Sequence, residues 1–258
     1  MAQQLAIEIK DLRKSFRGGR DQVLRGVNLA VPHGKLTFLL GSSGAGKSVL
    51  LKHMLGLLKP DSGDIHILGK SIPYDNPKEL NRMRQSFGMC FQYSALFDDL
   101  TVAENICFPL VEHSKLSKAE MRQKCEEKLI AVHLDPKVVM DKYPNELSGG
   151  MKKRVALARG IILEPSIILY DEPTTGLDPM TRNTVDELIL ETNQKFGLSS
   201  VIISHDMYSA LHYADVLAFL HKGEIVFCGP PAEFNKSEHP MVQGFLNAER
   251  IHVEGSHQ

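Results

Sequence analysis

The stretch GSSGAGKS, at residues 41–48, combines residue types that can hold phosphate groups. Its glycines let the backbone curl so that several amide N–H groups face an oxyanion. Lys47 can reach the outer phosphates of a nucleotide, and Ser48 can ligate Mg²⁺. An apolar segment precedes the stretch and a segment with helical spacing follows it, as a phosphate loop requires; the alternative is a chance glycine turn. We expect the following residues to bind phosphate: Gly41, Ser42, Ser43, Gly44, Ala45, Gly46, Lys47 and Ser48.

Two carboxylates follow a second apolar run, in the sequence IILYDEP. Asp171 stands at the end of the predicted strand, where an acid can hold the water shell of a nucleotide-bound Mg²⁺. Glu172 can polarise an attacking water, since a carboxylate in a partly dry site can serve as a general base. The alternative is that both acids only cap a strand. Together with the phosphate loop, they predict a nucleoside triphosphatase.

A further glycine-rich stretch, LSGGM, leads into a strongly helix-forming segment. Ser148 is a good N-cap residue, and Gly149 and Gly150 expose amides at a helix start, so this stretch can bind an anion. Met151 has no amide side chain, so the backbone amides and Ser148 must make any phosphate contact. The basic residues 152–154 are interpreted as solvated first turns of the helix. No aromatic residues are interleaved with them to support nucleic acid binding.

Composition narrows the class of protein. The chain has 258 residues, with 30 basic and 31 acidic side chains and a formal net charge of -1, so no global charge favours nucleic acid or an anionic membrane. Its four cysteines are far apart, which argues against a zinc site or a disulfide framework and for a reducing, cytoplasmic setting. We see no signal peptide and no apolar run of the roughly 18 to 20 residues that span a bilayer. At a membrane, another chain must hold this one.

The motifs must be positioned by alternating strands and helices. Such alternation, with a glycine loop after a buried strand, predicts an α/β fold with a mostly parallel sheet covered on both faces. We expect a hairpin that turns at Lys222 and Gly223. Strands are predicted at 5–12, 23–31, 35–41, 63–69, 166–173 and 199–206, and helices at 48–58, 115–134, 151–163 and 182–196.

The motifs occur in a recognisable order. The phosphate loop, Gln92, LSGGM, YDEP, GLDP and His205 together resemble the ATP-binding-cassette (ABC) family over nearly the whole chain. The resemblance implies a phosphate-loop NTPase core with an antiparallel β sub-domain and a helical sub-domain. It implies one ABC ATPase domain at 5–247, with the core and β sub-domain at about 5–92 and 156–235, the helical sub-domain at about 93–155 and a polar tail at 248–258.

The resemblance also implies roles for single residues. Phe16 matches the aromatic residue that stacks on adenine, although taken alone it reads as core. Gln92 matches the glutamine that touches the metal or its water, and His205 the switch histidine that contacts the γ-phosphate. Asp178, in GLDP, matches a loop that crosses to a partner subunit.

In the family, the glycine-rich stretch binds the γ-phosphate held by a second subunit. The resemblance therefore implies two copies paired head to tail around two Mg-ATP. The catalytic residues would be Glu172, His205 and Gln92. The metal ligands would be Ser48, Gln92 and, through water, Asp171. The trans contacts would come from Ser148, Gly149, Gly150 and Asp178.

Three stretches, SALFDDLTVAENICFPLVEH, LSGGMKKRVALARG and LYDEPTTGLDP, resemble the Mla-type branch of phospholipid transport ATPases. The partners implied are an MlaE-like permease, an MlaD-like MCE-domain protein and, as a further candidate, a STAS-domain protein, with no nucleic acid. The place implied is the cytoplasmic face of the bacterial inner membrane, with the chain bound peripherally. The segment from Gln92 to about Pro109 would receive the permease through Tyr93, Leu96, Phe97 and Leu100, an apolar set that could equally be core.

Other roles for an ABC ATPase stay open. One is an importer of amino acids or another small solute, and another is a soluble scaffold of the iron-sulfur assembly type. A nucleic-acid or ribosome-acting protein normally needs two cassettes or a long coiled-coil insertion, and this chain has neither. Since the segment after Phe245 is short, no contact of a longer C-terminal extension is transferred.

Overall fold

The computed structural model describes the backbone of residues 4–255 and the side chains of residues 4–247. The chain forms two compact units, one from residues up to 80 together with those from 203 onward, the other from residues 81–202. It passes between them within α2 (Pro77–Arg84) and within β8 (Ser199–Ser204). The predicted limits of the core and the helical sub-domain stay a prediction.

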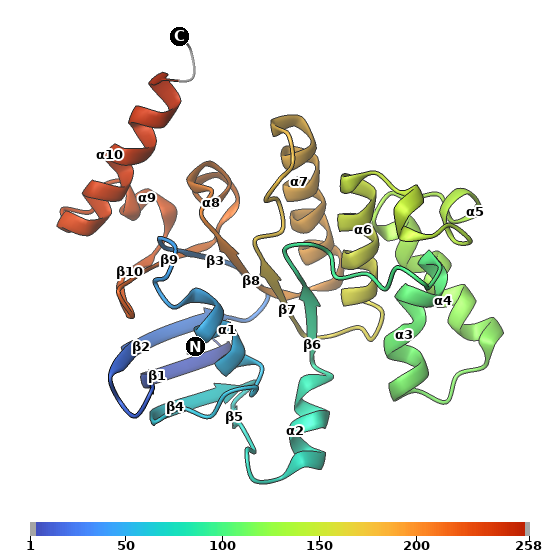
Figure 1. Cartoon of the computed structure of the whole chain (residues 1–258), viewed down its shortest axis with the longest axis horizontal. Coiled ribbons are helices and arrows are strands. Elements are labelled where there is room, and N and C mark those ends of the chain that lie inside the picture. The colour runs from blue at the N-terminus through green and yellow to red at the C-terminus, as the bar shows by residue number, and fades with distance from the viewer. Residues whose placement is uncertain (1–3, 256–258) are drawn as a thin grey trace. The chain divides into compact units, whose positions relative to one another are not determined.

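An antiparallel sheet builds one part of the first unit, in the order β2-β1-β4-β5. Apolar side chains of β1, among them Ile7, Ile9 and Leu12, are buried, whereas its charged residues face solvent or are half-buried. Figure 1 shows the three long strands side by side in blue and cyan. Its strands are β1 (Leu5–Phe16), β2 (Asp21–Pro32), β4 (Ser62–Ile67) and β5 (Lys70–Ser71).

The strand before the phosphate loop is β3 (Leu36–Leu40), and all five of its residues are buried, as its continuous apolar run predicts. It pairs in parallel with β9 (Val216–His221), which pairs antiparallel with β10 (Glu224–Gly229). Lys222 and Gly223 join the last two strands with φ of 45° and 84°, the left-handed values that a tight hairpin turn requires. The predicted hairpin is confirmed.

The helices of the first unit are α1 (Lys47–Met54), α8 (Met207–Tyr213), α9 (Pro231–Phe234) and α10 (Pro240–Gly255). The expectation that the first helix continues to residue 58 is wrong, because Gly56 turns the chain with a φ of 63°. The Phe245 ring of α10 lies 4.9 Å from that of Phe219 on β9. The backbone of the segment predicted as a polar tail is helical to Gly255, and residues 256–258 lie outside the described residues.

The second unit contains β6 (Phe87–Cys90) and β7 (Ile167–Asp171), which run parallel, with β8 next to β7 in the strand order. All residues of β7 before Asp171 are buried, and so are all of β8, as the two apolar runs predict. The helix α7 (Pro179–Phe196) follows β7. The chain thus has the expected α/β fold with a mostly parallel sheet, an antiparallel β part and a helical part.

The helical part of this unit gathers between β6 and β7 in the sequence, and Figure 1 draws it in green to yellow. The α3 and α4 helices each begin with a capping box, in which Thr101 pairs with Glu104 and Ser117 with Glu120. The elements are α3 (Val102–His113), α4 (Lys118–Ala131), α5 (Pro136–Val139), a short 3₁₀ turn η1 (Pro144–Glu146) and α6 (Gly149–Gly160).

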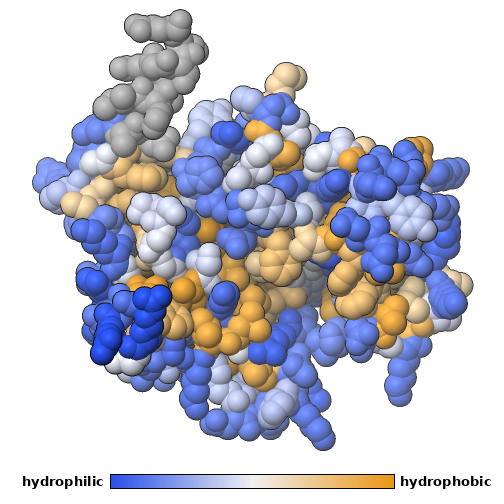
Figure 2. Space-filling model, in the orientation of Figure 1, coloured by the Kyte–Doolittle hydropathy of each residue, from blue (hydrophilic) through white to orange (hydrophobic). Residues whose placement is uncertain are grey.

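The face seen in Figure 2 is mostly hydrophilic, with hydrophobic side chains showing in smaller groups. Within the described residues, the helices are all too short or too polar to cross a membrane.

Candidate functional site

The phosphate loop of the first unit is shaped as an anion cradle. It leaves β3 after Leu40 and enters α1 at Lys47, with Gly46 at the N-cap in the left-handed region at a φ of 109°. Gly46 has no side chain to cap the helix, and the first turn carries no acid, so the first amides of α1 face an anion with no competing carboxylate of that turn. A side chain at Gly41 would come within 2.4 Å of the Leu220 carbonyl, so only glycine fits there.

Solvent reaches the loop where a nucleotide would bind. Ser42, Ser43 and Gly44 are exposed, and so is Ser48 on the first turn of α1. The Lys47 ammonium donates to the carbonyls of Gly41 and Ser42 at the base of the loop. These donors and the uncapped helix start fit the phosphates of a nucleotide.

Two more predicted residues belong to the first unit. The Phe16 ring ends β1 with 37% of the residue exposed, which rules out a fully buried core position and leaves a face for stacking. The Lys14 ammonium lies 5.8 Å from the centre of this ring. His205 directly follows β8 and is exposed, so its imidazole can reach a ligand.

The acids lie in the second unit, at the end of β7. Asp171 and Glu172 are both half-buried, and Glu172 has a left-handed φ of 50°, unusual for a residue with a side chain. The hydroxyl of Thr175 donates to Glu172 Oε2 across 3.2 Å, and the Thr175 amide donates to the Glu172 carbonyl across 3.3 Å. Thr175 is not among the site residues predicted above, although the run DEPTTG places a hydroxyl one turn after the acid.

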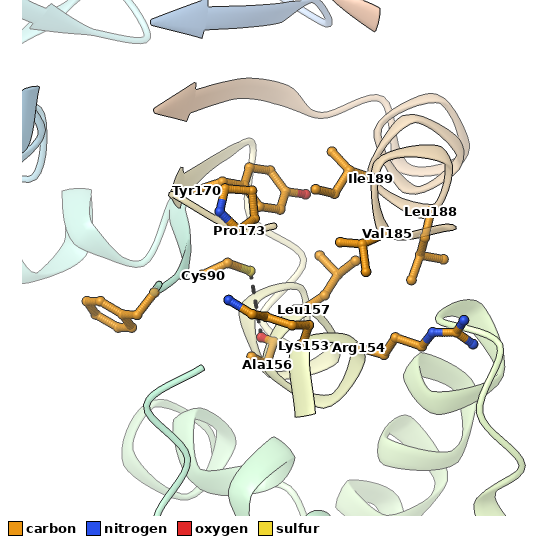
Figure 3. A pocket seen from close by; sticks show the side chains of 11 residues that line it. Cys90, Lys153, Arg154, Ala156, Leu157, Tyr170, Pro173, Val185, Leu188 and Ile189 are labelled. Atoms are coloured by element: carbon orange, nitrogen blue, oxygen red, sulfur yellow. Dashed lines mark hydrogen bonds between the residues drawn. The ribbon is translucent and has the colours of Figure 1, made fainter. Parts of the chain in front are cut away.

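Gln92 follows β6 and is held through its backbone, because the Lys153 ammonium donates to the Gln92 carbonyl. The expectation that residues 152–154 are solvated is wrong, because all three side chains are half-buried. Burial lowers the pKa of the Lys153 ammonium. Figure 3 shows Lys153 of α6 pointing toward Cys90, whose thiol donates to the Ala156 carbonyl across 3.8 Å.

The pocket in Figure 3 is too small for a nucleotide. Its volume of about 20 Å³ has room for one water. The buried Tyr170 hydroxyl, which lines it, makes no hydrogen bond within the described residues. This pocket is therefore a packing feature of the core.

The glycine-rich stretch opens into a larger hollow. Ser148 caps α6 as predicted, its hydroxyl accepting the Met151 amide across 3.3 Å. Gly149 and Gly150 line a cavity of about 500 Å³ together with Asp178, and none of its lining residues comes from the phosphate loop. The structure thus brings two separate predicted motifs to one hollow.

Asp178 has a second task in this hollow. Its Oδ1 accepts the Met180 and Thr181 amides across 3.1 and 3.0 Å and so caps α7. The hydrogen bonds with Thr181 and Met180 lower the pKa of the Asp178 carboxyl. Neither this cap nor the position of Thr181 in the lining of the hollow is among the predictions from the sequence.

The loop after Gln92 is pinned from two helices. The Arg159 guanidinium of α6 donates to the Ser94 and Ala95 carbonyls across 2.8 and 2.7 Å. Buried Asn105 of α3 donates to the Phe97 carbonyl across 3.0 Å and accepts the Phe97 amide across 2.8 Å. These bonds fix the backbone of a loop that lacks regular structure.

The apolar residues of this loop divide between surface and interior. Tyr93 and Phe97 are exposed, at 83% and 42%, whereas Leu96 and Leu100 are half-buried. The core alternative is therefore wrong for Tyr93 and Phe97. Phe97 lies 4.9 Å from Phe108, and both line a groove of about 440 Å³, which we call the aromatic groove. Its other lining residues are Phe87, Gly88, Met89, Phe91, Ala95, Pro109, Arg159, Gly160 and Leu163.

Comparison with known proteins decides the family. The model of the family described as ABC transporter matches residues 24–175, more than half of the chain. The chain belongs to the ABC transporter family. As an ABC ATPase, it binds and hydrolyses ATP.

Two curated relatives align with this ABC ATPase over almost its whole length. The probable ribonucleotide transport ATP-binding protein Mkl of Mycobacterium leprae is 41% identical over 97% of the chain and 71% of the relative. The intermembrane phospholipid transport system ATP-binding protein MlaF of Escherichia coli is 37% identical over 95% of the chain and 91% of the relative.

A solved ABC cassette, MJ0796, was captured as a dimer in a post-hydrolysis state with ADP and Pi. It matches 87% of this chain and 98% of its own with a TM-score of 0.77 and 31% identity. The ABC cassette fold expected from the order of motifs is confirmed.

Proposed function

We propose that this ABC ATPase works as a head-to-tail homodimer that closes on two Mg-ATP and drives a membrane permease for phospholipid. The main support for this proposal is the hollow lined by Gly149, Gly150 and Asp178. It joins a helix start to Asp178 and contains no residue of the phosphate loop. In the proposed dimer, the phosphates for this hollow belong to the ATP that is bound to the phosphate loop of a second copy of the chain.

Each set of residues has a part in this cycle. Lys47 and the loop amides hold the phosphates of ATP, Phe16 stacks on the adenine, and His205 contacts the γ-phosphate. Glu172 accepts the proton of the attacking water. The hydroxyl of Thr175 holds the Glu172 carboxylate in position for this step. From the other subunit, Ser148, Gly149 and Gly150 present the helix start to the γ-phosphate, beside Asp178.

The oxygen donors of the Ser48 hydroxyl, the Gln92 amide and, through water, the Asp171 carboxylate suit Mg²⁺. Bound with ATP, the ion would neutralise charge on the phosphates.

The aromatic groove is proposed as the seat of an MlaE-like permease. Tyr93 and Phe97 stand exposed on a pinned loop, so docking costs little ordering entropy. An MlaD-like MCE-domain protein and a STAS-domain protein are the further partners proposed, with the complex at the cytoplasmic face of a bacterial inner membrane. The phospholipid cargo rests on the likeness to MlaF over nearly its full length.

Purification in complex with an MlaE-like permease tests the cargo. We expect the complex in nanodiscs to hydrolyse ATP and to move a fluorescent phospholipid between membranes. Stimulation by methionine or another small solute, with no lipid movement, would replace the cargo assignment with the importer alternative. ATP hydrolysis by a chain that never binds a permease would favour the scaffold alternative.

A further inference from the structure

Two cysteines meet between neighbouring helices of the second unit. Cys107 lies on α3 and Cys125 on α4. The Cys107 thiol lies 3.4 Å from the Met121 carbonyl, which in a regular helix also accepts the amide of Cys125, four residues on. A helical Cα–Cβ bond leans toward the N-terminus, so the Cys125 side chain points back toward the turn of Met121. The Cys107 thiol thus contacts the turn of α4 toward which the Cys125 side chain points, and this places the two thiols next to each other.

The surroundings make these two thiols unequal. Cys107 is half-buried, whereas Cys125 is fully buried. The hydrogen bond from Cys125 lowers the pKa of Cys107, and the same bond, with burial, raises the pKa of Cys125. The Arg122 guanidinium also favours the Cys107 thiolate, while Glu126 disfavours ionisation of Cys125. The reachable thiol is thus the one that ionises first, and a shielded thiol stands beside it.

We propose that Cys107 and Cys125 form a peroxide-reactive pair that closes to a disulfide between α3 and α4. A low-pKa, accessible thiol next to a resolving thiol is the arrangement that hydrogen peroxide oxidises selectively. Neither cysteine belongs to the nucleotide site, so this reactivity does not depend on the proposed transport function.

The chemistry balances in two steps. The Cys107 thiolate attacks one oxygen of hydrogen peroxide, the O–O bond breaks, and the departing hydroxide takes up a proton to become water. This leaves Cys107 as a sulfenic acid. The Cys125 sulfur, giving up its proton, then attacks Cys107 Sγ; the S–O bond breaks and hydroxide leaves as water with that proton. Two thiols are oxidised to one disulfide, and one peroxide is reduced to two waters.

The other two cysteines serve as internal controls. Cys90 is buried, and burial raises the pKa of its thiol to about 12, so it should not react. Cys228 is exposed on β10 and reports on unselective oxidation.

Oxidation of Cys107 would also affect the aromatic groove, because Cys107 and one of the residues that line the groove lie on the same helix, α3. Phe108, the residue after Cys107, lines this groove and is 40% exposed. A disulfide at Cys107 would tie the helix that carries Phe108 to α4 and so restrain one wall of the groove.

To test this, the reduced protein is treated with an equimolar amount of hydrogen peroxide. Alkylation and mass spectrometry then show which cysteines are free and which are linked. We expect two of the four thiols to be lost, with Cys107 linked to Cys125 within one chain and released by dithiothreitol. The inference is overturned if Cys107 and Cys125 both remain alkylatable while Cys228 is oxidised, or if the only links join two chains.

Variants separate the two roles. Cys125→Ser should stop at the sulfenic acid of Cys107, which dimedone traps, whereas Cys107→Ser should give neither sulfenic acid nor disulfide at Cys125. Cys90→Ser and Cys228→Ser should keep the link. Dimedone on Cys125 in the Cys107→Ser protein would contradict the assigned order. If a serine variant does not fold, the link mapped in the unaltered chain decides alone.

Discussion

The hydroxyl of Thr175 donates to Oε2 of Glu172 across 3.2 Å, and the Thr175 amide donates to the Glu172 carbonyl. Glu172 has a left-handed φ of 50°, which a residue with a side chain keeps only where its surroundings hold it. Thr175 thus fixes both the backbone and the carboxylate of the proposed general base.

Thr175→Val should lower kcat for ATP about fivefold, because one hydrogen bond of about 1 kcal/mol no longer orients the carboxylate. The Kd for ATP should stay unchanged, since Thr175 is not among the residues proposed to bind phosphate. Thr175→Ser, which keeps the hydroxyl, should recover most of the rate. Steady-state kinetics and ATP titration measure both quantities.

A double-mutant cycle separates this effect from general damage. In a Glu172→Gln background, Thr175→Val should add almost nothing, because the group that it orients is already lost. Thr184→Val is the matched control. In the described part of the chain, the hydroxyl of Thr184 on α7 donates to the Met180 carbonyl of its own helix and has no contact with Glu172 among the side-chain hydrogen bonds. Equal, additive losses at Thr175 and Thr184 would sink the positioning role.

Lys47→Ala should abolish measurable ATP binding, because its ammonium is the mobile cation of the phosphate loop. Glu172→Gln should bind ATP normally but turn over at least about 100-fold more slowly, the usual contribution of a general base. Equilibrium binding and single-turnover hydrolysis distinguish the two losses. Normal turnover by Glu172→Gln would remove Glu172 from its proposed role, whatever the outcome for Thr175.

Ser148→Arg should prevent ATP-driven dimerisation, because a long cationic side chain would fill the hollow that Gly149, Gly150 and Asp178 line. Met151→Gln should keep activity within about tenfold, roughly 1.4 kcal/mol, since backbone amides make the phosphate contact. Light scattering of each variant, combined with Glu172→Gln to hold ATP, measures the dimer. A Ser148→Arg protein that dimerises and hydrolyses ATP normally would contradict the trans site.

Phe97→Asp should weaken capture of the permease at least about tenfold, because a charge would enter the aromatic groove, which Phe97 lines, on a loop that Asn105 holds in place. Tyr143→Asp is the matched control, as Tyr143 is also exposed, at 45%, but does not line the groove. Co-purification with the permease gives the readout, and unchanged melting temperatures establish that both variants fold. Equal capture by the two variants would place the permease elsewhere.

Asp61 should make stability depend on pH. Hydrogen bonds from Lys14 and Ser15 hold the pKa of the Asp61 carboxyl well below its ordinary value. A depressed acid pKa adds stability that is complete above the unfolded pKa of about 4 and is lost as the pH falls from there through the lower pKa of the folded state. Asp61→Asn should therefore cost up to about 1 kcal/mol, or about 2 to 4 °C in Tm, near pH 7. Melting curves at pH 7 and pH 2 should show this gap narrowing in acid, and a gap that is the same at both values would contradict it.

Local features of the site could be predicted because they depend on neighbours in the chain. The glycines of the phosphate loop, the Ser148 cap and the hairpin at Lys222 follow from backbone conformations that few residue types adopt. The apolar run of β7 likewise predicted a buried strand that ends in Asp171.

The sequence by itself determined which motifs the chain contains and the order in which they occur. This order was enough to indicate an ABC ATPase. Only the tertiary structure decided that Lys153 holds the Gln92 carbonyl, that Asp178 shares a hollow with Gly150, and that Cys107 meets Cys125. Propensity and periodicity act over a few residues, whereas these contacts depend on how α3, α4, α6 and the loops pack together. A charged residue on a helix is therefore predicted to be solvated from the sequence, and only the packing of neighbouring elements decides whether it is buried.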